Sequence, residues 1–382
     1  MPRNLLNRRT FVGLAAAAVA GGRLRAQAGV SRAAATRVNV AAIDRERILA
    51  AADAALAKPP RPLTSIAIAG SPGGAHDFYS TDSARGHSDA VFELAGIVPA
   101  LAAGATIVRG AEPERAARYA RHAKAHLDAW FADPATRMTP ALAYAGWVQN
   151  AKDSQPAAVV ETTGLAEVAV ALPFLGIDVK PYAAWFGEYS TWLNEDRQAL
   201  LARDLKDHQA SSWLLQAAAY AALTGDEKVL AELRHRFKAT TIRAQILSTG
   251  FFPHELTTAN PYRNSLFNLD LLCGVAVLLT TRFDSVWEHE LQDGPGMRSA
   301  VARYAPYIQD RHGWPYPSDE THFHDLPCRR PALLFAARAF AEPEYVGIWQ
   351  GLKPVEPASP ELLRTFPIRQ PVLWVPASER GG

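Results

Sequence analysis

Residues 207–226, DHQASSWLLQAAAYAALTGD, place Asp207 and His208 directly before a nearly unbroken apolar run. Apolar positions at helical spacing predict a helix that starts at this point, with Asp207 able to cap it. Unpaired N–H groups at a helix start favour anions and disfavour an imidazolium, so a neutral imidazole there can bind a carboxylate or accept a proton. A histidine that only caps the helix or lies on the surface has the same signature, so the residue type leaves both interpretations open.

The motifs of several common enzyme classes are missing from the chain. It contains no GxGxxG, P-loop, GxSxG or HExxH pattern, which argues against nucleotide-binding, serine-hydrolase and zinc-protease functions. His322 and His324, followed by Asp325, resemble part of a metal site. However, HxH spacing directs both rings to one side only in a strand, and no third ligand is marked, so we interpret them as surface histidines. We therefore expect neither a metal nor another cofactor.

The elements that position these residues are predicted to be helices almost throughout. Apolar residues recur at intervals of three and four in about a dozen segments, and no stretch alternates with period two for long, so strands should be few or absent. Many of these segments are apolar on more than one side, which indicates inner helices covered by outer ones. We expect an all-α, double-layered helical barrel, an incomplete α/α-toroid. A helical solenoid is the alternative, but the chain shows no fixed repeat period. The predicted helices cover residues 88–104, 112–131, 139–150, 162–176, 180–202, 207–224, 227–247, 264–281, 297–309, 330–341 and 360–366.

The first 28 residues are typical of an export signal. They hold paired arginines, Arg8 and Arg9, then a short apolar run and Ala26-Gln27-Ala28, the pattern of a twin-arginine signal peptide cleaved after Ala28. The apolar run is shorter than the roughly 20 residues that span a bilayer. We expect a periplasmic protein with no membrane attachment after cleavage.

The rest of the chain is interpreted as one large unit. Residues 29–60 are predicted to form a linker and a first helix, residues 61–375 the toroid, and residues 376–382 a tail. Removing the five arginines of the signal changes the formal net charge from +2 to −3, so the mature chain is not a general binder of nucleic acid. We expect a monomer.

Several stretches, in order along residues 60–375, resemble the alginate lyase family of polysaccharide lyases. These stretches are GGAHDFYS at 73–80, AWFADPATRMTPALAYA at 129–145, ETTGLAEV at 161–168, residues 207–226, SLFNLDLL at 265–272, DGPGMRSAVARYAPYI at 293–308, WPYP at 314–317, LPCRRPALLF and FPIRQPVLWV. The resemblance implies an α/α-toroid that cleaves uronic-acid polymers by β-elimination, with an acidic polysaccharide as its partner.

β-Elimination on a uronate needs three kinds of group. Donors neutralise the sugar carboxylate, a base removes the C5 proton, and an acid protonates the leaving oxygen. In the family an Asn-His pair near a helix start, an arginine and a tyrosine fill these roles. His208 matches the family histidine, whereas Asp207 stands where the family usually has asparagine and can equally be a helix cap.

The chain departs from the family pattern at the acid/base pair. Aligning SLFNL places Asn264 where the family has its tyrosine, and Thr258 where an arginine is common. Tyr262 and Arg263 lie just before Asn264, so a local shift could make Tyr262 the proton donor and let Arg263 bind the carboxylate. The remaining predicted substrate-binding residues are Asp207, Asn264, His254, Trp213 and Tyr79.

Three functions follow from these observations. The first is a lyase for an alginate-like polysaccharide, with His208, Tyr262 and Arg263 as catalytic residues. The second is a carbohydrate-binding protein on the same fold that has lost catalysis with the tyrosine. The third is a glycoside hydrolase, which requires two carboxylates about 5 to 10 Å apart. Asp207 and Glu255 are the only pair that we nominate for it.

Overall fold

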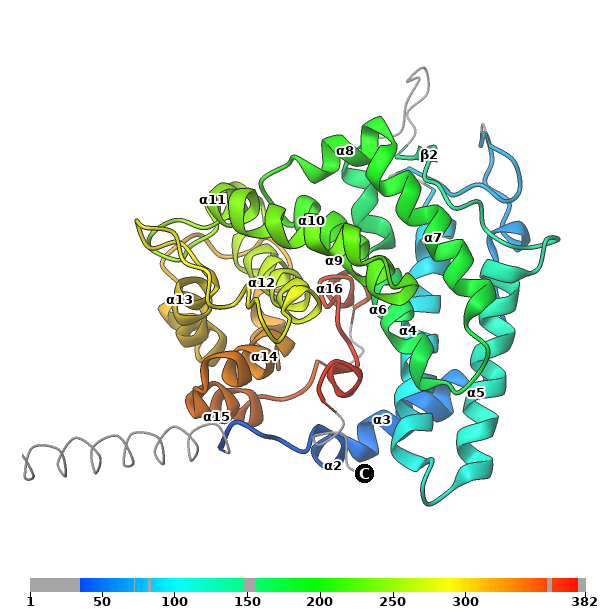
Figure 1. Ribbon diagram of the computed structural model, residues 1–382, viewed down its shortest axis with the longest axis horizontal. Coiled ribbons are helices and arrows are strands. Elements are labelled where there is room, and N and C mark those ends of the chain that lie inside the picture. The colour runs from blue at the N-terminus through cyan, green and yellow to red at the C-terminus, as the bar shows by residue number, and fades with distance from the viewer. Residues whose placement is uncertain (1–34, 72, 82–83, 147–155, 356–358, 377–382) are drawn as a thin grey trace, which may run out of the picture.

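The computed structural model describes residues 35–71, 73–81, 84–146, 156–355 and 359–376. The predicted signal peptide and most of the predicted tail lie outside these residues, and the boundary between linker and toroid stays a prediction. Figure 1 shows helices arranged around a centre that is occupied by the C-terminal part of the chain.

Fifteen labelled helices and two very short strands make up the described regular structure, besides short 3₁₀ and π turns. The helices are α2 (Val40–Ile43), α3 (Arg45–Ala55), α4 (Gly86–Val108), α5 (Pro113–Leu127), α6 (Leu165–Ala171), α7 (Lys180–Glu195), α8 (Arg197–Arg203), α9 (His208–Thr224), α10 (Glu227–Arg236), α11 (Ile242–Gln245), α12 (Pro261–Leu279), α13 (Met297–Gln309), α14 (Pro331–Phe340), α15 (Pro343–Gly351) and α16 (Pro360–Leu363). The strands β1 (Tyr79–Ser80) and β2 (Tyr144–Ala145) pair in parallel.

The helices form two layers. The inner helices α4, α6, α9, α12 and α14 contact one another in this order, so they line the centre of an open ring. The outer helices cover them: α3 and α5 pack on α4, α7, α8 and α10 on α9, and α13 and α15 on α14. The expected fold, a helical toroid with almost no strand, is confirmed.

Helix α9 shows why the sequence produces an inner helix. Every residue from Ala210 to Ala221 is buried, because the helix is apolar around most of its circumference and is covered on all sides. Asp207 caps its start by accepting a hydrogen bond from the Gln209 amide at 2.9 Å. The helix ends at Gly225, whose φ of 72° requires a left-handed conformation that glycine adopts without strain.

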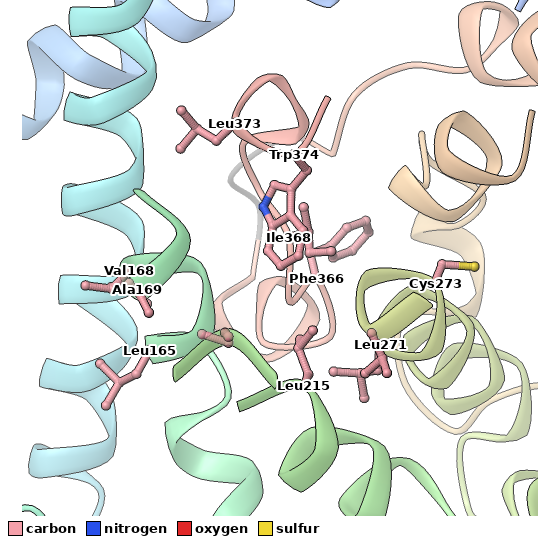
Figure 2. Close-up of a cluster of buried hydrophobic side chains, with 14 of the residues drawn as sticks. Leu165, Val168, Ala169, Leu215, Leu271, Cys273, Phe366, Ile368, Leu373 and Trp374 are labelled. Atoms are coloured by element: carbon pink, nitrogen blue, oxygen red, sulfur yellow. The ribbon is translucent and has the colours of Figure 1, made fainter. Parts of the chain in front are cut away.

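The centre of the ring is filled by the C-terminal segment, residues 359–376. Figure 2 shows Phe366, Ile368, Leu373 and Trp374 of this segment among apolar side chains of α6, α9 and α12. Because these side chains are buried, the segment closes the central space as a packed core and is not a loose tail.

Helix α4 is long and apolar enough to cross a membrane by length and composition alone. In the structure it lies between α3, α5 and α6, and 78% of its most apolar window is buried inside the protein. Its apolar sequence is therefore accounted for by its inner position.

Two helix predictions need correction, and one helix was not predicted. Residues 139–150 do not form the predicted helix over their described part, which contains turns and β2. The predicted helix 180–202 is divided at Asp196, which caps α8 by accepting from the amides of Gln198 and Ala199. Helix α15 was not predicted, since its sequence is short and carries a glycine in its middle.

Candidate active site

A pocket of about 220 Å³ opens at the N-terminal ends of α9 and α12, beside the C-terminal segment. The pocket is lined by residues of helices α4, α9 and α12, of the turn that precedes α6, and of the C-terminal segment. The lining residues are Arg85, Val91, Phe92, Ala95, Val160, Glu161, Thr163, Gly164, His208, Asn264, Phe267, Glu361, Arg364, Thr365, Phe366, Pro367 and Arg369.

His208 is the first residue of α9 and is held from behind by Glu255. The Glu255 carboxylate accepts a hydrogen bond from the His208 backbone amide at 2.6 Å and contacts the ring Nδ1 at 2.9 Å. Glu255 is fully buried, whereas the His208 side chain keeps 18% of its surface exposed at the pocket. The pair fixes the ring through Nδ1 and leaves Nε2 as the nitrogen available to a ligand.

The charge of His208 is governed by two opposing effects. Burial lowers the pKa of His208, because an imidazolium loses hydration, but the hydrogen bond and negative charge of Glu255 outweigh this. The resulting pKa lies above the usual 6.5. The sequence argument for a neutral imidazole at the helix start is therefore wrong in direction, since it did not include a buried carboxylate behind the ring.

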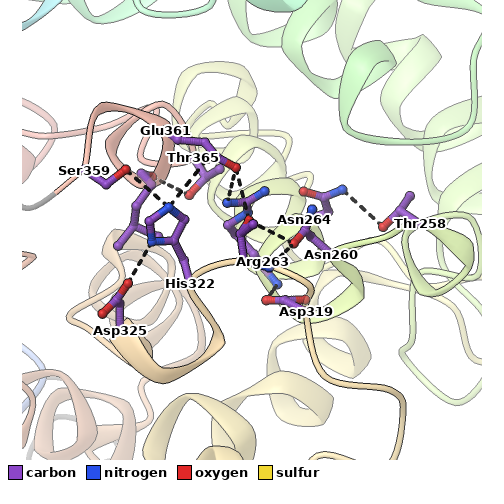
Figure 3. A network of polar contacts seen from close by, with 12 residues as sticks. Thr258, Asn260, Arg263, Asn264, Asp319, His322, Asp325, Ser359, Glu361 and Thr365 are labelled. Atoms are coloured by element: carbon purple, nitrogen blue, oxygen red, sulfur yellow. Dashed lines mark hydrogen bonds and ion pairs between the residues drawn. The ribbon is translucent and has the colours of Figure 1, made fainter.

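Asn264 is on α12 and lines the same pocket as His208. Its amide Nδ2 donates to Thr258 Oγ1 at 3.1 Å (Figure 3). The two positions at which the family pattern has tyrosine and arginine thus contact each other here through an amide and a hydroxyl. Asn264 therefore lines the pocket, and its role in substrate binding stays a prediction; its amide is not a group that transfers protons readily.

Three arginines give the pocket its positive charge. Arg85 precedes α4, whereas Arg364 and Arg369 come from the C-terminal segment. The guanidinium carbons of Arg364 and Arg369 lie over the Phe92 ring, 4.6 and 4.1 Å from its centroid. Such a wall suits a carboxylate better than a neutral ligand.

Two carboxylates also line the pocket. Glu161 is half-buried and accepts a hydrogen bond from Ser80 Oγ at 2.9 Å. Glu361 accepts from Arg263 Nη1 at 2.9 Å and from Thr321 Oγ1 at 3.1 Å, so its charge is already paired. The hydrogen bond from Arg263 lowers the pKa of Glu361 against a smaller opposing effect of burial.

Tyr262 and Arg263 were predicted to act in the pocket, but neither residue lines it. The Tyr262 ring is buried between Trp314 and Phe323, and its hydroxyl donates to the Tyr307 carbonyl at 2.6 Å. Burial raises the pKa of Tyr262. Tyr262 and Asn264 are two positions apart on α12, so their side chains are about 200° apart around the helix and face opposite sides. A local shift of the chain cannot exchange the two.

Arg263 is used inside the protein (Figure 3). Its side chain is 7% exposed and pairs with Glu361, while the backbone amides of Tyr262 and Arg263 donate to Asp319 at 2.8 and 2.9 Å. Arg263 therefore anchors α16 to the start of α12 and does not bind the ligand directly.

The other predicted substrate-binding residues lie elsewhere. Trp213 is buried and its indole N–H donates to the Leu193 carbonyl at 2.9 Å, so its ring is core and not a sugar platform. Tyr79 is buried in β1, and His254 is exposed; neither lines the pocket. Asp207 is the helix cap described above, also outside the pocket lining.

The carboxylate pair nominated for glycoside hydrolysis is not assembled. Asp207 binds the backbone and side chain of Gln209, whereas Glu255 is fully buried and occupied by His208. Neither carboxylate faces an open site, so this arrangement does not support the hydrolase.

His322 is not the plain surface residue that the sequence suggested. Its Nδ1 contacts Asp325 at 2.7 Å, and its Nε2 lies 3.2 Å from Ser359 Oγ and 3.6 Å from Glu361 (Figure 3). It joins the 319–325 loop to the start of α16. Within the described residues, no group of three or more histidine, cysteine or acidic side chains could hold a metal ion.

Sequence reasoning missed the arginines and Glu161. One signal was available: Arg369 interrupts the apolar stretch FPIRQPVLWV, and a charge in a buried segment needs a function or a partner. Arg85 offered no such signal, because its sequence surroundings are polar, and Arg364 stands in the short stretch PELLRTF, which has the spacing of an ordinary amphipathic helix turn.

The fold and the pocket together define a helical toroid whose pocket is lined by three arginines, two carboxylates and a carboxylate-supported histidine. The sequence pattern of the alginate lyase family matches residues 75–314. The chain therefore belongs to the alginate lyase family, a family of polysaccharide lyases.

A solved structure supports the fold. The crystal structure of an alginate lyase from Bacteroides ovatus superimposes with a TM-score of 0.70 at 19% sequence identity, covering 86% of this chain and 93% of that one. Among curated proteins, no sequence matches the chain significantly.

Proposed function

We propose that the protein cleaves a uronate-containing polysaccharide by β-elimination in the pocket at His208. The observation that carries the proposal is a histidine with Nδ1 held by a buried carboxylate, in the same pocket as three arginines. The arginines bind the sugar carboxylate and reduce its charge, which makes the neighbouring C5–H more acidic.

In this proposal His208 carries the proton. Nε2 of the neutral imidazole accepts the C5 proton, the C–H electron pair becomes the C4–C5 double bond, and the C4–O bond breaks. The imidazolium, stabilised by Glu255, then returns the proton to the departing oxygen. Asn264 donates a hydrogen bond to the substrate in place of the family tyrosine.

The test is incubation of the purified protein with alginate, polymannuronate and polyglucuronate, following the ultraviolet absorbance of the unsaturated product. We expect the wild type to form product on at least one polymer and His208→Gln to lose at least about 100-fold in rate, as for a lost general base. Equal rates for both proteins would refute the role of His208.

A second function is favoured by one specific observation. No tyrosine is found among the described residues that line the pocket, and the Asn264 amide is tied to Thr258. A protein that binds acidic oligosaccharides without cleaving them would have the same arginine wall. Calorimetric binding of oligouronates, together with no product after prolonged incubation, would select this function.

We also propose export to the periplasm through residues 1–28, with release as a monomer free of the membrane. The paired arginines Arg8 and Arg9 support the route. Replacing both by lysine should retain the precursor in the cytoplasm in a fractionation experiment, whereas unchanged export would argue for another route.

A further inference from the structure

Two of the three pocket arginines come from a part of the chain beyond the family match. The match ends at residue 314, whereas Arg364 and Arg369 belong to the C-terminal segment, residues 359–376, that fills the ring. The matched residues contribute one pocket arginine, Arg85, and the C-terminal segment adds the other two.

The two arginines differ in how far their charge is already satisfied. Arg364 pairs with Asp89 and donates to Ser88 Oγ at 3.1 Å. Besides its contact with the Phe92 ring, the Arg369 guanidinium makes one long hydrogen bond, 3.5 Å, to the Phe92 carbonyl, and it has no acidic partner within ion-pair distance among the described residues. Burial lowers the pKa of Arg369 to about 10, which still leaves it charged at neutral pH.

The backbone at Arg369 is fixed independently of its side chain. The backbone amide of Arg369 donates hydrogen bonds to both carboxylate oxygens of the buried Glu167 of α6, each at 2.9 Å. The backbone amide of Gln370 donates to one of these oxygens at 2.7 Å. The side chain then passes Gly96 of α4, where an added Cβ would lie 3.1 Å from Arg369 Nη1. Glu167 also acts on the guanidinium through its charge, but no acidic side chain lies within ion-pair distance of it among the described residues. A guanidinium with little freedom and a place in the pocket wall is preorganised for an anion.

We propose that Arg369, assisted by Arg364, is the specificity-determining residue that selects a sugar carboxylate. The inference rests on the proposed function for its substrate class. It assigns recognition to the C-terminal segment and proton transfer to His208. Arg369 is thus a binding residue, and Glu167 and Gly96 are the residues that position it.

The experiment separates recognition from turnover by using a His208→Gln background. Calorimetry measures the affinity for a saturated oligouronate prepared from alginate and for the same oligosaccharide with its carboxyl groups reduced to alcohols. The parent should prefer the uronate. Adding Arg369→Gln should weaken uronate binding by about tenfold or more, the value of a lost charge-assisted hydrogen bond, and leave the reduced ligand nearly unaffected.

Two further variants control the result. Arg298 also lies over a phenylalanine ring, Phe340, at 4.2 Å but outside the pocket, so Arg298→Gln should not change the preference. Gly96→Ala keeps every charge but crowds the guanidinium, and it should reduce the uronate preference in part. Circular dichroism and thermal unfolding of each variant confirm that it is folded.

Different failures are distinguishable. If His208→Gln prefers the uronate equally with and without the added Arg369→Gln change, this inference is overturned and the proposed function is unaffected. A parent that binds neither ligand, together with a wild type that forms no product, refutes the proposed function itself. If the folded Arg369→Gln variant loses affinity for both the uronate and the reduced ligand, the role of Arg369 is structural and the inference is also overturned.

Discussion

At the residue scale, the chemistry depends on a histidine whose two ring nitrogens have different surroundings. Nδ1 faces a carboxylate that no water reaches, and the ring edge faces the pocket. Such a carboxylate orients the imidazole and stabilises the imidazolium that forms when a proton is accepted. Glu255 thus acts through His208, as a positioning residue.

The pH dependence of the reaction tests this coupling. A base works in its neutral form, so kcat/KM should rise with pH through the His208 pKa, which Glu255 holds above 6.5. Glu255→Gln removes the larger of the two charges that raise this pKa and leaves burial, which lowers it, opposed only by the smaller effect of Asp207. The acidic limb of the kcat/KM profile should therefore move to lower pH, with a lower plateau because the imidazolium loses its support. A limb that stays in place or moves to higher pH would contradict the assignment.

At the element scale, the register of α12 decides which side chain meets His208. Positions 262 and 264 point to opposite sides of the helix, so the pocket receives an amide and the core receives the phenol. The anchoring of the helix start by Asp319 keeps this register.

A pair of substitutions on α12 tests the register. Asn264→Tyr places a phenol on the pocket side, next to a cavity of about 220 Å³, and should increase the lyase rate by about tenfold or more by supplying a proton donor. Tyr262→Phe removes only the hydrogen bond to Tyr307. It should leave the rate within about twofold and lower the free energy of unfolding by about 1 kcal/mol.

The measurements are initial rates on the best polymer and denaturant unfolding of each variant. If Tyr262→Phe abolished turnover while remaining folded, the hydroxyl would be catalytic, and the register described here would not hold in solution.

At the scale of the whole molecule, the C-terminal segment joins the two ends of the open ring and brings charge into its centre. Arg330, at the start of α14, pairs with Asp270 of α12 at 3.1 Å and donates to the Thr365 carbonyl of the segment at 3.1 Å. All three groups are buried. On the other side of the ring, Arg364 of the segment pairs with Asp89 of α4, 275 positions away along the chain. The site therefore depends on contacts that span most of the chain.

Removing one member of this buried pair should be costly. Asp270→Asn leaves the Arg330 charge without its acidic partner and should lower the free energy of unfolding by about 3 to 5 kcal/mol. Asp270→Leu with Arg330→Met should be much less destabilising than the single change, because no unpaired charge remains. Chemical denaturation of the three proteins measures both effects. A double variant at least as destabilised as Asp270→Asn would show that the unpaired charge is not the cause of the loss.

The sequence predicted the helical class and the double layer because inner helices must be apolar on several sides. Helix α9 carries that signal along its whole length. The helix prediction failed at 139–150, where the described residues form turns and a short strand and their apolar side chains still pack on the core. Local spacing cannot distinguish these cases, since both bury the same side chains.

For the site, the sequence predicted through aligned positions two residues that line the pocket, His208 and Asn264. Of its two interpretations of Asp207, the helix cap is the one that the structure shows. The sequence could not identify Glu255 as the partner of His208, because the two are 47 residues apart and meet only when the turn before α12 packs against α9. It misplaced Tyr262 and Trp213 because proximity in sequence says nothing about which face of a helix is buried.

The amino-acid sequence by itself determined the toroid and the position of a histidine at an inner helix start, since periodicity and capping act over a few residues. Only the tertiary structure decided which charges surround that histidine. Arg364 and Arg369 line the same pocket as His208 although they are more than 150 residues away along the chain, because Phe366, Ile368 and Trp374 are buried and hold the C-terminal segment inside the ring. Long-range packing, which no local pattern encodes, therefore determines what the pocket can bind.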